Sequence, residues 1–205
     1  MQRIIVLIAV LSFTANGFSQ GSITLGSSSQ VHFAEVINLS STEIKVFINR
    51  TRQKVDEFQE FMIILASKEE SRERKNLAEK EALKLFYPNA RIETTITSAQ
   101  GVKEVVSRTI KEYLYRLKIL PYTKVVIEFY DIAYVTTFAK GRDGRYYGTA
   151  TIFQKFTGFN GDDMVYSSVT KKEIEVILEN IEDEFYGEKR WKIFLGDIKA
   201  SEARS

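Results

Sequence analysis

The spacing of the apolar residues changes near Pro121, and this change limits the chain to few folds. Before Pro121, apolar residues recur at steps of three and four, the period of a helix with one buried face. From Tyr122 onward they alternate with polar residues, which is the period of a β-strand. Helices followed by a run of strands predict an α+β domain, with the helices covering one face of an antiparallel sheet.

Each of the three predicted helices begins with the spacing of a capping box, in which a Ser or Thr is followed three residues later by Glu. Ser40 and Glu43 mark the start of a helix over residues 40–66, and Thr109 and Glu112 mark the start of another. The residues that we expect to face inward on these two helices are Ile44, Phe47, Ile48, Thr51, Val55, Phe58, Met62, Leu65, Ile110, Tyr113, Leu114 and Leu117.

A further helix and a hairpin are predicted between these two helices. The spacing of Ser67 and Glu70 repeats the capping signal and predicts a helix to about Phe86. Its inward residues are Ala78, Ala82, Leu85 and Phe86. Residues 91–97 and 102–106 then read as two short strands joined by a turn.

The second half of the chain predicts a meander of long antiparallel strands. They cover residues 124–138, 146–159, 164–179 and 190–200. Strands of this length imply a strongly twisted and curved sheet, and we expect a β-bulge near Asp131. The dipeptide Asn160-Gly161 predicts a two-residue hairpin turn, because both residue types tolerate a positive φ.

The N-terminus has the layout of a secretory signal peptide. Arg3 precedes an apolar run, Ile4–Phe13, and a small residue at Ser19 offers a cleavage site. We therefore expect an exported protein, periplasmic or secreted, with no integral membrane segment once the signal peptide is removed. The chain divides into a signal peptide, a flexible lead-in or arm, and one domain, at residues 1–19, 20–39 and 40–202.

Composition excludes several kinds of chemistry. The chain has no cysteine, so disulfides, thiolate metal sites, cysteine nucleophiles and a lipid anchor on a cleaved N-terminal cysteine are excluded. The single histidine, His32, lies before the predicted domain core and cannot form a multi-histidine metal site. A net charge of +2 gives no electrostatic case for nucleic acid. We expect neither a cofactor nor a bound metal.

The order of elements and two segments resemble the nuclear transport factor 2-like superfamily, a cone-shaped α+β fold, over residues 43–202. The segments are Tyr146–Thr149, which leads into a central strand, and Trp191–Ile198, which is similar to the last strand of uncharacterised exported bacterial members. The resemblance implies a curved sheet that wraps the helices, with a small apolar ligand often held at the mouth of the cone. Some members are isomerases or cyclases and others are binding or dimerising modules, so the fold does not choose between these functions.

Proton-transfer chemistry would require a buried carboxylate beside a tyrosine hydroxyl. The sharpest candidates are Glu128 or Asp197, paired with Tyr130 or Tyr147. Acids and tyrosines are also common on half-exposed strands, where they serve no catalysis. An isomerase- or cyclase-like enzyme is therefore the alternative hypothesis, and no catalytic residue is assigned.

The main hypothesis is a non-enzymatic binding or assembly module that uses its curved sheet or its cone pocket. Aromatic residues occupy both faces of the predicted strands, and an apolar outer face usually marks an interface. We expect contacts to a protein partner or to a second copy through Tyr130, Tyr134, Tyr147 and Trp191. Two alternatives stay open: the arm at residues 31–39 covers this face, or the cone carries a small apolar ligand.

Overall fold

A computed structural model describes residues 39–97, 103–182 and 189–204, which all lie in one compact unit, Asn38–Ser205. The predicted signal peptide, residues 20–38 of the predicted lead-in, His32, the turn at Gln100-Gly101 and most of the acidic connection before the last strand lie outside these residues. They stay predictions.

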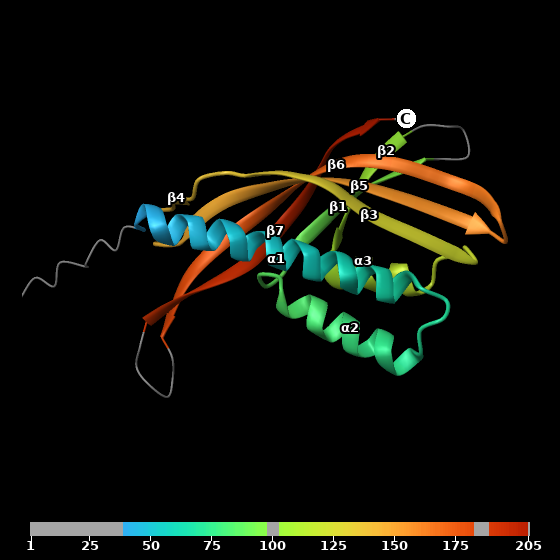
Figure 1. Cartoon of the computed structure of the whole chain (residues 1–205), viewed down its shortest axis with the longest axis horizontal. Coiled ribbons are helices and arrows are strands. Elements are labelled where there is room, and N and C mark those ends of the chain that lie inside the picture. The colour runs from blue at the N-terminus through green and yellow to red at the C-terminus, as the bar shows by residue number, and fades with distance from the viewer. Residues whose placement is uncertain (1–38, 98–102, 183–188, 205) are drawn as a thin grey trace, which may run out of the picture. The chain divides into compact units, whose positions relative to one another are not determined.

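The described unit contains three helices and seven strands, and it is an α+β fold as the sequence predicts. Figure 1 shows the three helices on one face of the sheet, with α1 lying along it. In chain order the elements are α1 (Ser41–Ala66), α2 (Arg72–Lys84), β1 (Arg91–Thr97), β2 (Lys103–Thr109), α3 (Ile110–Lys118), β3 (Lys124–Val135), β4 (Ala139–Lys140), β5 (Tyr146–Asn160), β6 (Asp163–Glu182) and β7 (Lys189–Arg204).

The sheet is open and mostly antiparallel, with the strand order β2-β1-β7-β6-β5-β3 and β4 paired to β5. The prediction of a wholly antiparallel sheet is wrong at one junction, because β1 runs parallel to β7 where Ile92 pairs with Ile198. The chain reaches β1 along β7: the Leu195 N–H donates to the Leu85 oxygen, at 2.8 Å, and the Tyr87 N–H donates to the Leu195 oxygen, at 2.7 Å. The first strand of the hairpin, β1, therefore starts beside β7 and runs in the same direction as β7.

The predicted capping boxes on the first and third helices are confirmed. The Ser40 hydroxyl accepts from the Glu43 N–H at 3.2 Å, and the Glu43 carboxylate accepts from the Ser40 N–H at 2.8 Å. Thr109 and Glu112 make the same reciprocal pair at the start of α3. Each box satisfies backbone N–H groups that a helix start leaves without intrahelical partners.

The predicted start of the second helix is wrong by one turn. Ser67 ends α1, since its N–H donates to the Ile63 oxygen at 3.0 Å, and its hydroxyl accepts from the Glu69 N–H at 3.2 Å. Ser71 caps α2 instead and accepts from the Arg74 N–H at 3.1 Å. Two serines four residues apart compete for the same role, and the turn between the helices selects the later one.

Bulges interrupt the long strands. The register of β3 against β5 shifts between Tyr130 and Tyr134, which confirms the bulge expected near Asp131. A second bulge in β7 places Gly196 and Asp197 opposite Glu175 of β6. Without a side chain at Gly196 this approach is allowed, because a Cβ there would overlap the Glu175 carboxylate.

The hairpin between β5 and β6 is shifted by one residue from its prediction. Asn160 pairs with Asp163, so the two loop residues are Gly161 and Asp162. Gly161 carries the positive φ, 61°, while Asn160 stays in the strand.

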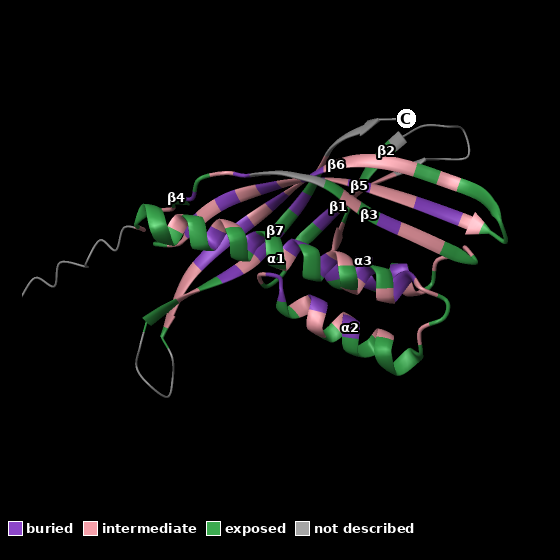
Figure 2. Cartoon of the chain, in the orientation of Figure 1, coloured by how far each residue is buried: buried purple, intermediate pink, exposed green. Residues whose placement is uncertain are grey.

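The core lies between the helices and the facing side of the sheet. Figure 2 shows buried residues at alternate positions along the strands and as stripes along the helices. Its largest fully buried side chains are Phe58, Met62, Leu65, Ile92, Leu114, Ile152, Ile174, Leu178, Leu195 and Ile198. No helix within the described ranges has the length and apolar character that crossing a bilayer requires.

Candidate functional site

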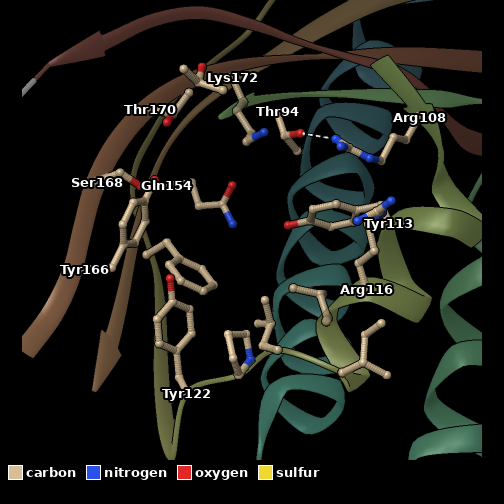
Figure 3. A pocket seen from close by; sticks show the side chains of 16 residues that line it. Thr94, Arg108, Tyr113, Arg116, Tyr122, Gln154, Tyr166, Ser168, Thr170 and Lys172 are labelled. Carbon is tan, nitrogen blue, oxygen red and sulfur yellow. Dashed lines mark hydrogen bonds between the residues drawn. The ribbon is translucent and has the colours of Figure 1, made fainter. Parts of the chain in front are cut away.

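The core is not filled everywhere: a cavity of about 380 Å³ lies between α3 and the sheet (Figure 3). We call it the inner cavity. Its walls come from β1, β2, α3, the segment after α3, β5 and β6, and it opens to solvent. Its lining residues are Thr94, Thr95, Arg108, Tyr113, Arg116, Leu117, Ile119, Leu120, Pro121, Tyr122, Gln154, Phe156, Tyr166, Ser168, Thr170 and Lys172.

Among the residues whose burial the structure describes, Lys172 is the only buried charged one, and it forms the deep polar end of the inner cavity. It shares a face of β6 with Ile174 and Val176, so the alternation of the strand directs it toward the helices. Its exposed fraction is 4 %, and its Nζ donates to the Glu93 backbone oxygen at 2.9 Å.

Burial lowers the pKa of Lys172 to about 8, and the negative charge of Glu93 opposes this only in part. Among the residues that the structure describes, no carboxylate lies within ion-pair distance of the Lys172 amine. The carboxylate of Glu93 instead accepts from the Ala200 N–H at 3.0 Å. A perturbed, desolvated titratable group inside a cavity is a candidate functional group.

Two further polar side chains, Tyr113 of α3 and Gln154 of β5, converge on the same space. Figure 3 shows both, with Lys172, directed toward the middle of the inner cavity. Burial raises the pKa of the Tyr113 hydroxyl, while a hydrogen bond with Gln154 acts in the opposite direction. The Tyr113 hydroxyl also lies 3.5 Å from the sulfur of Met62.

Two arginines add positive charge to the lining. Arg108 reaches the cavity from β2, where its Nη1 donates to the Thr94 hydroxyl at 2.8 Å, and Arg116 reaches it from α3. Neither Asp nor Glu lines the inner cavity within the described part of the chain. The charged side chains that line the inner cavity are therefore all cationic.

The outer end of the inner cavity is apolar and aromatic. The ring centroids of Tyr122 and Tyr166 are 6.3 Å apart in a stacked pair, and Phe156 lies 6.0 Å from Tyr122 and 5.8 Å from Tyr166. Tyr122 fits against the sheet because position 158 is glycine; a Cβ at Gly158 would lie 2.8 Å from the Tyr122 ring.

The arrangement can bind a small molecule that is apolar at one end and polar at the other. Three donors or acceptors sit at the deep end, and three aromatic rings sit at the outer end. A lysine with a pKa near 8 is also in part uncharged at neutral to alkaline pH, so its amine can accept a proton. Within the described residues, no group of His, Cys, Asp and Glu has the arrangement of a metal site.

The carboxylates proposed from the sequence lie at the protein surface. Glu128 is exposed on β3, 3.6 Å from the Lys155 amine. Asp197 is exposed in the β7 bulge, where it accepts from the Arg91 N–H at 2.8 Å. The Tyr147 hydroxyl donates to Asp143 at 2.5 Å. Neither carboxylate has the burial that the proposed proton transfer requires.

Tyr147 and Asp197 do line one hollow, of about 420 Å³, on the opposite face of the sheet from the helices. That hollow also contains Glu173, Glu175 and Lys199, and its walls are polar. The hydrogen bond to Asp143 is the main cause of a raised pKa for Tyr147. This tyrosine is thereby held as a donor to a neighbouring side chain.

The aromatic residues proposed for partner binding do not all lie on the outer face of the sheet, because Trp191 turns toward the core. Trp191 packs against the core, with its ring 5.4 Å from that of the buried Tyr146. Tyr130 is 40 % exposed and stacks on Phe153, which lies six residues beyond Tyr147 on β5, or about 20 Å along the strand. Tyr134 pairs with Thr151 through its backbone, and its side chain lies outside the described part.

Sequence reasoning overlooked Lys172, Gln154 and Tyr113 as a group. A signal was present for Lys172, since it lies two positions before Ile174 and four before Val176 on a strand of alternating burial. Tyr113 was expected to face inward, but only as part of the core. No spacing rule relates three residues on β6, β5 and α3.

Comparisons with known proteins add no relative: no family model, no curated protein and no solved structure matches this chain.

Proposed function

We propose that this chain is a non-enzymatic binding protein that holds a small molecule in the inner cavity. The observation that carries the proposal is the inner cavity itself, about 380 Å³, with Lys172 at its deep end and an aromatic wall at its mouth. Ligand pockets occupy about 300–1,000 Å³ and combine apolar walls with a few convergent polar groups. The inner cavity has both properties.

The energetics of the site support the same function. Burying a lysine without an ion-pair partner is unfavourable. A ligand that pairs with the Lys172 amine would offset this penalty, and its apolar body would displace water from the aromatic wall of the inner cavity.

The proposal extends to the fold family and the location of the protein. Three helices on one face of a mostly antiparallel sheet, with a cavity under the third helix, support membership of the nuclear transport factor 2-like superfamily. The layout of residues 1–19 supports export. Contact with a protein partner or a second copy stays a prediction, for which the exposure of Tyr130 near the sheet edge is the remaining support.

A cavity-filling variant tests the proposed function. Ser168 lines the inner cavity, and its neighbour Ser167 is exposed on the other face of β6. Ser168→Phe is expected to occupy the cavity, and Ser167→Phe serves as the matched control.

Native mass spectrometry of freshly purified protein, and isothermal titration with 1-naphthamide as a neutral probe, are the two measurements. We expect the wild type and Ser167→Phe to bind a single small molecule and Ser168→Phe to bind none. Absence of binding by the wild type in both measurements, or equal binding by Ser168→Phe, would refute the proposal.

A further inference from the structure

We infer that the ligand of the inner cavity is a small amphipathic carboxylate, whose acid group contacts Lys172 and whose apolar body lies against Tyr122 and Phe156. This inference rests on the proposed function and names the chemical class of its ligand. It follows from the charge of the lining, from the donors at its deep end and from the shape of its apolar end.

The charge of the lining selects a negative ligand. Lys172, Arg108 and Arg116 contribute three positive charges, and no described residue forms an ion pair with any of them. The carboxylate of Glu93 accepts a backbone hydrogen bond and lines no part of the inner cavity. An anion would compensate this charge, whereas a cationic ligand would add to it.

The donors at the deep end suit a carboxylate. The Lys172 ammonium has three N–H donors, and among the described residues only the Glu93 backbone oxygen accepts one of them. Gln154 and Tyr113 lie beside it, and Figure 3 shows all three side chains directed to one space. A carboxylate has about four acceptor positions and forms charge-assisted hydrogen bonds with such donors.

The apolar end limits the size and shape of the ligand. Tyr122, Phe156 and Tyr166 form a wall of rings with centroids about 6 Å apart. A flat aromatic or a short aliphatic body can pack against this wall. With a volume of about 380 Å³, the inner cavity can hold a molecule the size of a bicyclic aromatic acid.

Binding of a carboxylate should depend on pH through Lys172. The charged and titratable groups that face it are Glu93 of β1, Arg108 of β2, and Tyr113 and Arg116 of α3. A bound carboxylate favours the protonated amine. Affinity is therefore highest when Lys172 is charged and falls as the pH rises above about 8.

Isothermal titration with 1-naphthoate and its neutral isostere 1-naphthamide tests the inference. We expect the wild type at about pH 7 to prefer the acid by tenfold or more, roughly the effect of a hydrogen bond to a charged group. The preference should fall at about pH 10, and it should be lost in Lys172→Met while 1-naphthamide still binds. Lys80→Met, an exposed lysine on α2, is the control and should keep the preference.

The outcomes separate this inference from the proposed function. Equal binding of the acid and the amide by the wild type, or an unchanged preference in Lys172→Met, overturns the carboxylate assignment and leaves the proposed function standing. Binding of neither probe, together with no small molecule found by native mass spectrometry, overturns both. Retained binding of 1-naphthamide by Lys172→Met shows that this variant is folded, so a lost preference cannot be attributed to unfolding.

Discussion

Replacing Lys172 with methionine should make the protein more stable at neutral pH, because burying the charged amine of Lys172 lowers the free energy of unfolding. Its pKa falls from 10.5 to about 8 on folding. A difference of one between the folded and unfolded pKa corresponds to about 1.4 kcal/mol. Burying the charged amine therefore lowers the free energy of unfolding by about 3 kcal/mol. Methionine has a similar length and carries no charge.

The variant also loses a hydrogen bond. Lys172 donates to the Glu93 oxygen, and a bond of this kind contributes about 1 kcal/mol. The expected net effect of Lys172→Met is therefore a gain of about 2 kcal/mol in the free energy of unfolding at pH 7.

The pH dependence identifies the cause. Because the folded-state pKa of Lys172 is below its unfolded value, the penalty is fully present below about pH 8. It decreases as the pH rises from about 8 to 10.5 and is absent well above 10.5, where the amine is neutral in both states. The advantage of Lys172→Met should therefore shrink by about 3 kcal/mol between pH 7 and pH 10.5 and change sign.

Urea unfolding of the wild type and the variant, followed by circular dichroism at several pH values, measures this difference. Lys80→Met provides the baseline for loss of an exposed lysine, and its difference from the wild type should stay nearly constant over the same range. If Lys172→Met destabilises the protein at pH 7, or if its advantage does not change with pH, the proposed burial penalty is wrong.

Two further substitutions test how the inner cavity is built. Gly158→Ala should displace the ring of Tyr122, since the new Cβ would lie 2.8 Å from it. We expect the free energy of unfolding in urea to fall by about 1–3 kcal/mol. An unchanged midpoint would contradict the close packing of the aromatic wall. Thr109→Ala removes the cap of α3, which carries Tyr113, and should cost about 1 kcal/mol. Thermal denaturation checks the second substitution, and a melting temperature equal to that of the wild type would count against the capping role.

Local signals were enough to place most elements. The capping boxes at Ser40 and Thr109 lie within one turn of backbone, so the residues that form them are close in any fold that contains the helix. The alternation along β5 and β6 likewise follows from strand geometry alone. Where two local signals competed, as at Ser67 and Ser71, the sequence did not decide which serine would cap the helix.

The candidate site could not be predicted in the same way. The spacing of apolar residues predicts which face of an element turns inward, as it did for Tyr113. It does not predict whether other side chains fill the space in front of that face. Lys172, Gln154, Tyr113 and Tyr122 come from β6, β5, α3 and the segment after it, and no local rule sets the distances between them. A carboxylate–tyrosine pair is a pattern expected of an enzyme, whereas the inner cavity is lined by a lysine, a glutamine and tyrosines and by no carboxylate of the described chain.

The amino-acid sequence by itself determined the α+β class, the three helices, the long strands and the faces they bury, because each depends on contacts between neighbours along the chain. Only the tertiary structure decided that β1 lies parallel to β7, that Glu128 and Asp197 stay at the surface, and that Lys172 enters a cavity. These features depend on how elements distant in sequence pack together. The cavity under α3, which Lys172 enters, results from how these elements pack and not from the periodicity of any one of them.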